Sequence, residues 1–144
     1  MCMAVRWRRS PTISAEHWPG STSYLGFGQG TFAPDAAFRF MGNVAMDKAG
    51  NIRMGYTVSS SQISPGIRFT GRSVSDPPNQ MAIEQQAVQG KGSQLSPGRW
   101  GDYASMSIDP TDDCTFWFST QYVSQTGKFN WSTSIVPVKF TSCQ

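Results

Sequence analysis

The stretch VAMDKAGNIRMGYT, residues 44–57, returns 62 residues later as MSIDPTDDCTFWFS, residues 106–119, and this pair of segments decides the fold. In both copies apolar residues alternate on each side of a turn that contains aspartate. In the first turn Asp47 can accept hydrogen bonds from backbone amides, and Gly50 supplies a positive φ. Residues 109–113, DPTDD, replace that turn in the second copy. Each copy therefore predicts two antiparallel strands joined by a tight reversal.

The same interval recurs elsewhere in the chain. The triplet Ile67-Arg68-Phe69 has counterparts 62 residues away on either side, Val5-Arg6-Trp7 and Phe129-Asn130-Trp131. At an offset of 60, Gln29-Gly30, Arg39 and Phe40 match Gln89-Gly90, Arg99 and Trp100. Self-similarity at a fixed period of this length is typical of repeat architectures. The sequence predicts a continuous repeat of about 62 residues.

Composition points to an all-β protein. Serine and threonine fill 30 of the 144 positions, 12% of the residues are aromatic, and leucine and glutamate occur only twice each. Strong helix formers are thus scarce, whereas strand and turn formers dominate. A helical bundle is excluded, and a βαβ protein nearly so.

Four strand-like segments, residues 42–46, 51–59, 66–73 and 81–90, fit one repeat. Four antiparallel strands repeated about every 60 residues describe a β-propeller blade. Residues 1–28 then form the last strands of a preceding blade (4–9 and 23–28) with an irregular insertion. Residues 29–98 form a complete blade and linker, and residues 99–144 form three strands of the final blade. The expected fold is an all-β propeller fragment of about two and a quarter four-stranded blades.

A propeller ring typically has four to eight blades, so we expect this chain to be the C-terminal end of a longer protein. The N-terminal blades of that protein would be its first partners. The missing fourth strand of the last blade agrees with this expectation, because ring closure commonly takes that strand from the N-terminal end.

Four segments carry a family resemblance: residues 41–47, MGNVAMD; 67–72, IRFTGR; 99–103, RWGDY; and 113–117, DCTFW. They resemble the C-terminal blades of large secreted bacterial β-propeller proteins that are sialidase-like in fold and mostly uncharacterised. The Asp47 and Asp109 turns are similar to the Asp-box of such propellers, although Ala45 stands where that motif has serine. The resemblance implies an extracellular parent protein. It does not imply sialidase activity, because one fold serves both hydrolases and binding proteins.

Arg99, Asp102 and Tyr103 are the candidate ligand-binding residues. They precede an expected innermost strand, and an arginine with a carboxylate and a phenol suits an acidic or hydroxylated sugar. In the alternative interpretation Asp102 caps the strand and pairs with Arg99, while Trp100 and Tyr103 pack between blades.

Metal, cofactor and catalytic sites are not evident in the sequence. Asp109, Asp112 and Asp113 favour a solvated turn over a calcium site, and we expect no metal and no cofactor. A glycoside hydrolase needs two placed carboxyl groups, and only Asp102 stands in a suitable position. With His17 as its one histidine, the chain offers no Ser-His-Asp or Cys-His arrangement. Whether the parent protein is an enzyme stays open.

The partner classes are narrowed by charge and hydropathy. The net charge of +3 comes from scattered basic residues without a basic stripe, which argues against nucleic acid. No apolar run approaches the roughly 20 residues of a membrane span, and residues 1–10 lack the apolar core of a signal peptide. The expected ligand is a glycan or an extracellular protein.

The three cysteines, at positions 2, 114 and 143, predict one disulfide. Cys114 begins the second strand of the last blade, and Cys143 lies just beyond the third strand. Since antiparallel neighbours bring the start of one strand beside the end of the other, Cys114 and Cys143 can reach disulfide distance. This bond would leave Cys2 free and would imply an oxidising compartment.

Two hypotheses for function follow. In the first, the chain is part of an extracellular β-propeller that acts as a non-catalytic scaffold and binds a glycan or a protein. In the alternative, it is the non-catalytic end of a sialidase-like glycoside hydrolase.

Overall fold

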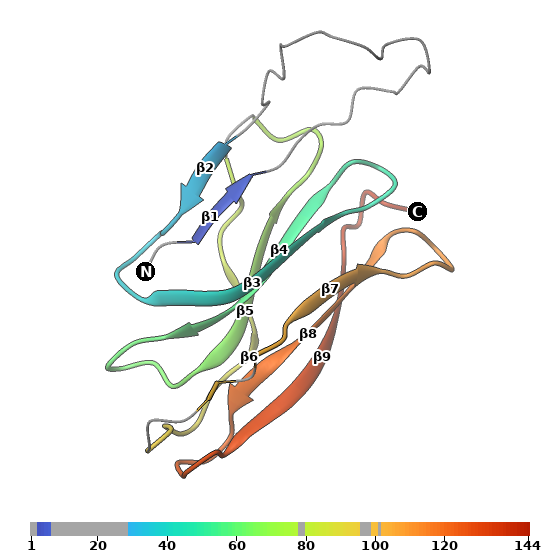
Figure 1. The fold of residues 1–144 in the computed structure, drawn as a ribbon. Coiled ribbons are helices and arrows are strands. Elements are labelled where there is room, and N and C mark those ends of the chain that lie inside the picture. Colours follow the sequence, from blue (N-terminus) through green and yellow to red (C-terminus); the bar gives the residue numbers. More distant parts are fainter. Residues whose placement is uncertain (1–2, 7–28, 78–79, 96–98, 101) are drawn as a thin grey trace, which may run out of the picture.

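The computed structural model describes residues 3–6, 29–77, 80–95, 99–100 and 102–144. These residues form antiparallel sheets and no helix, which confirms the all-β prediction (Figure 1). In particular, the described part of the chain holds no helix that is long and apolar enough to cross a membrane.

Nine strands make up three sheets. A two-stranded sheet pairs β1 (Met3–Arg6) with β2 (Gln29–Phe32). A four-stranded sheet has the order β3 (Phe38–Met46), β4 (Ile52–Ser59), β5 (Gly66–Arg72) and β6 (Gln85–Val88). A three-stranded sheet has the order β7 (Ser105–Ile108), β8 (Thr115–Val123) and β9 (Trp131–Lys139). In both larger sheets, strands adjacent in sequence pair with one another.

Strand boundaries differ from the expected ones in three places. Strand β3 begins four residues before the expected 42–46 and contains a register shift between Phe40 and Asn43, where Met41 has φ 54°. The expected strand 81–90 is shortened to β6, because residues 81–84 leave the ladder. The expected strand 23–28 lies outside the described residues.

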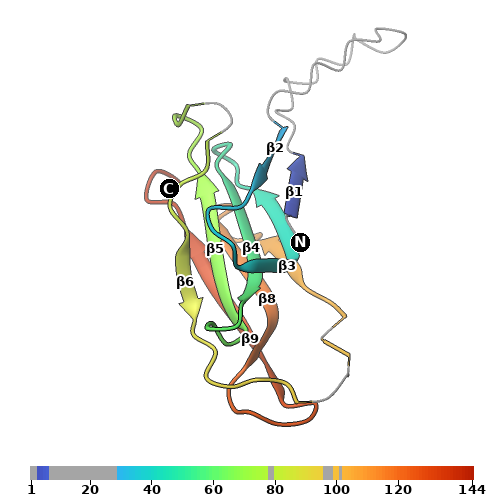
Figure 2. The same ribbon diagram turned by 90° about the vertical axis from the view of Figure 1, so that its left-hand side faces the viewer.

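The four-stranded and three-stranded sheets pack face to face (Figure 2). Strand β3 contacts β7, and both β4 and β5 contact β8. Gly55 lies against the ring of Phe118, so close that a Cβ at position 55 would stand 2.5 Å from a ring carbon. Hydrogen bonds also cross between the sheets, from Asn43 Nδ2 to the Ala104 carbonyl (2.9 Å) and from Thr57 Oγ1 to the Gln121 carbonyl (3.3 Å).

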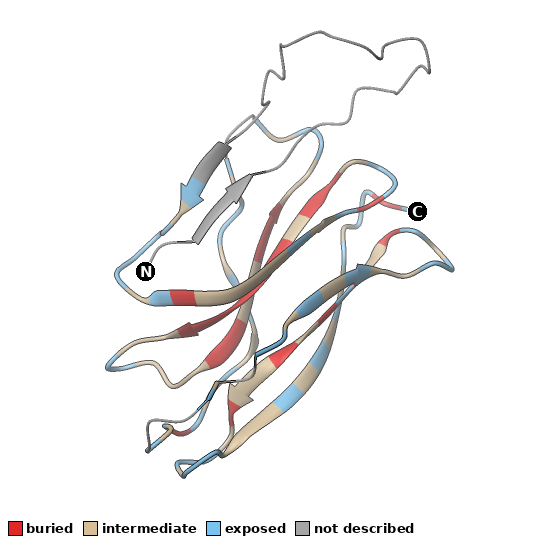
Figure 3. Ribbon diagram, viewed as in Figure 1, coloured by how far each residue is buried: buried red, intermediate tan, exposed pale blue. Residues whose placement is uncertain are grey.

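The hydrophobic core lies on the opposite face of β4. Because side chains alternate along a strand, Ile52, Met54, Tyr56 and Val58 point away from the face that carries Gly55. These four residues are buried, and Phe32, Ala37, Ile63 and Met81 pack against them. Strand β4 is therefore buried on both faces, as the colouring in Figure 3 shows.

The expected repeat is kept in two strand pairs and lost in the third. Tyr56 of β4 pairs with Arg68 of β5, whereas Phe118 of β8 pairs with Val136 of β9. The interval is 62 residues between Tyr56 and Phe118 but 68 between Arg68 and Val136. Phe129, with φ 51°, precedes β9 and is not in the position of Ile67 in β5. A longer β8–β9 turn accounts for the difference.

A disulfide joins Cys114 to Cys143, as predicted, with a Cα–Cα distance of 5.6 Å. Both cysteines are buried. The bond ties the segment after β9 to the start of β8, beside the register pair Thr115–Lys139. Cys2 lies outside the described residues.

Strand β9 is an edge strand of its sheet. It pairs with β8 along its whole length, and among the described residues nothing pairs with its other side. Pro137 stands within it, opposite Trp117. Residues 133, 135 and 137 of β9 are exposed, with Ile135 at 64%. The outer face of this sheet thus presents apolar side chains to solvent.

Candidate functional site

The three candidate ligand-binding residues lie in the segment that leads into β7. Arg99 forms an ion pair with Asp102, while 79% of the Arg99 side chain is exposed. Tyr103 is 84% exposed, and its carbonyl oxygen accepts a hydrogen bond from Gln121 Nε2 at 3.3 Å. Trp100 packs edge-to-face on Phe40, with ring centroids 5.6 Å apart. The structure thus brings Arg99 and Asp102 together and leaves the Tyr103 side chain in solvent.

The Asp47 turn is held by its own carboxylate. Asp47 is buried, and its Oδ1 accepts hydrogen bonds from the backbone amides of Ala49 (3.0 Å) and Asn51 (2.9 Å). Its Oδ2 accepts from Asn51 Nδ2 at 2.8 Å. Gly50 adopts φ 85°, as the turn prediction requires. Asp47 therefore closes the β3–β4 reversal and has no oxygen left for a ligand.

The acidic turn before β8 uses its carboxylates in the same way. Asp109 accepts from the Thr111 amide (2.8 Å) and from Trp117 Nε1 (3.1 Å), and these bonds lower its pKa. Asp112 accepts from the amides of Cys114 and Thr115, which lower its pKa well below the ordinary range. Within the described ranges no group of three His, Cys, Asp or Glu side chains is arranged to hold a metal ion.

The two turns also contact each other. The Lys48 amide donates a hydrogen bond to the Asp113 carbonyl at 3.0 Å. Equivalent turns of the two packed sheets are therefore linked directly.

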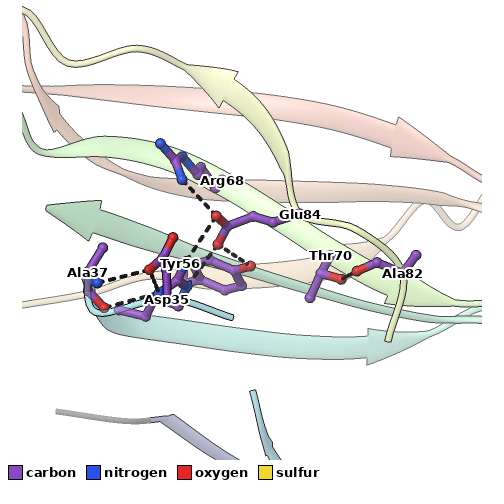
Figure 4. A network of polar contacts seen from close by, with 8 residues as sticks. Asp35, Ala37, Tyr56, Arg68, Thr70, Ala82 and Glu84 are labelled. Carbon is purple, nitrogen blue, oxygen red and sulfur yellow. Dashed lines mark hydrogen bonds and ion pairs between the residues drawn. The ribbon is translucent and has the colours of Figure 1, made fainter. Parts of the chain in front are cut away.

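A buried ionic cluster, which sequence reasoning missed, lies on the core face of the four-stranded sheet (Figure 4). Glu84 Oε1 accepts hydrogen bonds from Arg39 Nε and from the Tyr56 hydroxyl, both at 2.8 Å. Glu84 Oε2 accepts from Arg68 at 2.7 Å and from a second Arg39 nitrogen at 3.1 Å. Asp35 adds a second carboxylate, 2.7 Å from Arg39. We call these five residues the Glu84 cluster.

The charges of the Glu84 cluster are fixed by these bonds. Burial works to raise the pKa of Glu84, but hydrogen bonds from Arg39, Arg68 and Tyr56 outweigh it and the pKa is lowered. Burial, together with the bond to Glu84, raises the pKa of Tyr56. The hydrogen bond from Arg39 lowers the pKa of Asp35 to about 2. At neutral pH the cluster therefore holds an ionised glutamate and a neutral tyrosine.

The arrangement of the Glu84 cluster favours a structural role. Each Glu84 oxygen already accepts two hydrogen bonds, which fills its usual capacity. Tyr56 is fully buried and cannot meet a substrate. Ala82 is tied down as well, its amide bonding the Gly71 carbonyl (2.8 Å) and its carbonyl accepting from Thr70 Oγ1 (2.6 Å). The cluster thus fastens residues 81–84 over the core.

One sequence signal pointed toward this cluster. Arg39 and Arg68 both fall at positions that the repeat matches, and Glu84 is one of only two glutamates. Their pairing could not be read from the sequence, because Arg39 and Glu84 are separated by 45 positions.

Two pockets flank the loop between β4 and β5. The smaller, of about 210 Å³, is lined by Arg68 and by the glutamines at positions 62, 86 and 89. The larger, of about 340 Å³, lies between residues 59–65 on one side and Ser93, Gln94 and Trp100 on the other. We call the larger one the serine pocket. Arg99, Asp102 and Tyr103 line neither pocket.

Comparison with known proteins leaves the geometry as the basis for a functional argument. The chain matches no protein-family model, no curated protein and no solved structure.

Proposed function

We propose that the chain is part of an extracellular β-propeller and serves there as a non-catalytic scaffold that binds a glycan or a protein surface. The observation that carries this proposal is the face-to-face packing of two successive antiparallel sheets through corresponding strands, β3 on β7 and β4 on β8. Successive blades of a propeller are arranged around a ring in this order. The linked Asp47 and Asp109–Asp113 turns support the same arrangement.

The outer face of the three-stranded sheet supports a further neighbour. Trp117, Ile135 and Pro137 are exposed there, and they lie in one row across β8 and β9. A single exposed apolar residue is ordinary on a protein surface, but a row of them over a sheet marks a contact face. In the proposed ring this face packs against the next blade.

The described carboxylates argue for binding over catalysis. Glycoside hydrolysis needs two carboxyl groups that face one sugar, one of them free to exchange a proton. Glu84 is saturated by its partners, Asp47 is saturated by its turn, and Asp102 is paired with Arg99 on the surface. The buried disulfide is compatible with an oxidising, extracellular location.

Two assays on the purified, oxidised chain test this function. The first screens an array of neutral and sialylated glycans together with extracellular matrix proteins. The second follows release of chromophore from aryl glycosides, including an aryl sialoside. We expect binding to at least one arrayed ligand and no hydrolysis above a heat-denatured sample. Hydrolysis, or failure of the folded chain to bind any arrayed ligand, would overturn the proposal.

A further inference from the structure

We infer that the serine pocket binds a neutral saccharide. This inference rests on the proposed binding function and goes beyond it, because it names the site and the class of ligand. The pocket is formed by the loop of residues 59–65, by Ser93 and Gln94, and by the indole of Trp100. Its volume of about 340 Å³ lies within the range of about 300–1,000 Å³ typical of small-molecule sites.

The chemistry of the lining selects an uncharged, hydroxyl-rich ligand. Five serines and two glutamines face the pocket, and no ionisable side chain does. Serine hydroxyls and glutamine amides each donate and accept hydrogen bonds, as sugar hydroxyls do. A carboxylate or phosphate would lose its hydration there without meeting an opposite charge. The smaller pocket, with Arg68 in its wall, lacks this neutrality.

Trp100 supplies the apolar wall that a sugar ring needs. Its indole is braced by Phe40, so the wall is held in place before a ligand arrives. The Trp100 Nε1 is buried and has no hydrogen-bond acceptor among the described residues. An unsatisfied buried donor of this kind costs about 1–3 kcal/mol, and native proteins rarely keep one without a partner. A ligand hydroxyl is a suitable acceptor.

The loop wall is organised by its own hydrogen bonds. The Ser60 amide donates to the Ile63 carbonyl at 2.9 Å, and Ser60 Oγ accepts from the amides of Gln62 (3.1 Å) and Ile63 (3.0 Å). The Pro65 carbonyl accepts from the Val123 amide at 2.9 Å, which fixes the loop to the end of β8. A preorganised wall reduces the entropy lost when a ligand binds. The Gln62 side chain remains exposed and available.

Titration calorimetry with lactose, maltotriose, cellotriose, mannotriose and sialyllactose tests the inference on the oxidised chain. We expect at least one neutral sugar to bind, and we expect sialyllactose to bind no better than lactose. Trp100→Leu and Gln62→Ala should each weaken the bound sugar at least fivefold. Gln125→Ala, a matched exposed glutamine outside the pocket, should leave the affinity unchanged.

A second readout does not depend on the variants. In an amide and indole NMR spectrum of the unmodified chain, the Trp100 Nε1–H signal should move on addition of the bound neutral sugar. An unmoved indole signal together with unchanged affinity of both variants would overturn the serine pocket as the site. If only sialyllactose, only an arrayed protein or none of the sugars binds, the inference is wrong, whereas the proposed binding function fails only if every arrayed ligand is also refused.

Discussion

Glu84 concentrates more of the polar bonding of the chain than any other described side chain. It holds Arg39 and Arg68 on adjoining parts of the sheet, and it gives the Tyr56 hydroxyl its acceptor inside the core. The Arg39 side chain is only 2% exposed, so its charge depends on Glu84 and Asp35 for compensation. A buried charge without its partner is far more costly than the pair is stabilising.

Replacement of Glu84 by alanine should therefore be strongly destabilising. The expected loss is about 3–5 kcal/mol in the free energy of unfolding, because two arginines and a buried hydroxyl lose their acceptor. Glu84→Gln, which keeps the shape and one oxygen, should lose less. Urea denaturation followed by circular dichroism measures both changes.

Asp113→Asn is the matched control for this series. Asp113 is exposed, and asparagine tolerates its φ of 54°. Its unfolding free energy should stay within about 0.5 kcal/mol of the parent protein. Equal losses in Glu84→Ala and Asp113→Asn would refute the role assigned to Glu84.

Acid should weaken the fold through the same carboxylates. The pKa of Glu84 is lowered and that of Asp35 is about 2 in the folded chain, whereas unfolded carboxyls titrate near 4. A lowered folded pKa adds stability that is present above the unfolded pKa and is lost as pH falls through the folded one. Urea midpoints should therefore be level above about pH 5.5 and fall from about pH 5 to pH 2. In Glu84→Gln this fall should be shallower, and an unchanged slope would count against the cluster as its source.

At the level of strands, the contact between β4 and β8 depends on the absence of a side chain at position 55. Gly55 lets the Phe118 ring lie directly on the backbone of β4. Alternate residues of β8, including Phe116 and Phe118, are buried, so the ring has no free volume into which to move.

Gly55→Ala should separate the two sheets locally. Overpacking of this kind costs about 1–3 kcal/mol of unfolding free energy. The double variant Gly55→Ala with Phe118→Leu should lose less than the sum of the two single variants, because the smaller side chain relieves the overlap. Thermal denaturation of the four proteins measures this coupling, and strictly additive losses would show that the two residues do not press on each other.

Strands also show where sequence reasoning succeeds. Alternating apolar residues around Asp47 and Asp109 identified two hairpins, and the order of antiparallel strands placed Cys114 beside Cys143. Both results follow from local periodicity and chain direction. The β8–β9 register could not be found in this way, because the length of a turn decides it and the triplet at 129–131 imitates the triplet at 67–69. The Glu84 cluster was missed for a related reason, since alternation assigns a residue to a face without naming its partner across the sheet.

At the scale of the molecule, the chain is a stack of sheets with one apolar face open. The two packed sheets cover each other, and the Glu84 cluster closes part of the opposite side. On the outer face of the β7–β9 sheet, Ile135 lies between Thr133 and Pro137 along one strand. An isolated chain with such a face is expected to associate with its own copies.

Ile135→Lys should shift the isolated chain toward the monomer. The 64% exposed isoleucine contributes to the contact face without supporting the core, so a lysine there should oppose association and leave folding intact. Light scattering coupled to gel filtration over a range of concentrations measures the change. Thr133→Lys adds the same charge on the same face of β9 and should act more weakly. A parent chain that is monomeric at every concentration would contradict the exposed contact face.

Pro137 limits the form that such association can take. Proline is found in sheets where its missing N–H faces away from the ladder, so the free edge of β9 has a gap in its row of donors. A foreign strand aligned with that edge cannot form an unbroken ladder, and edges of this type resist cross-β growth. Copies of this chain should therefore meet through their faces in finite or amorphous assemblies, and amyloid-specific dyes should find little to bind.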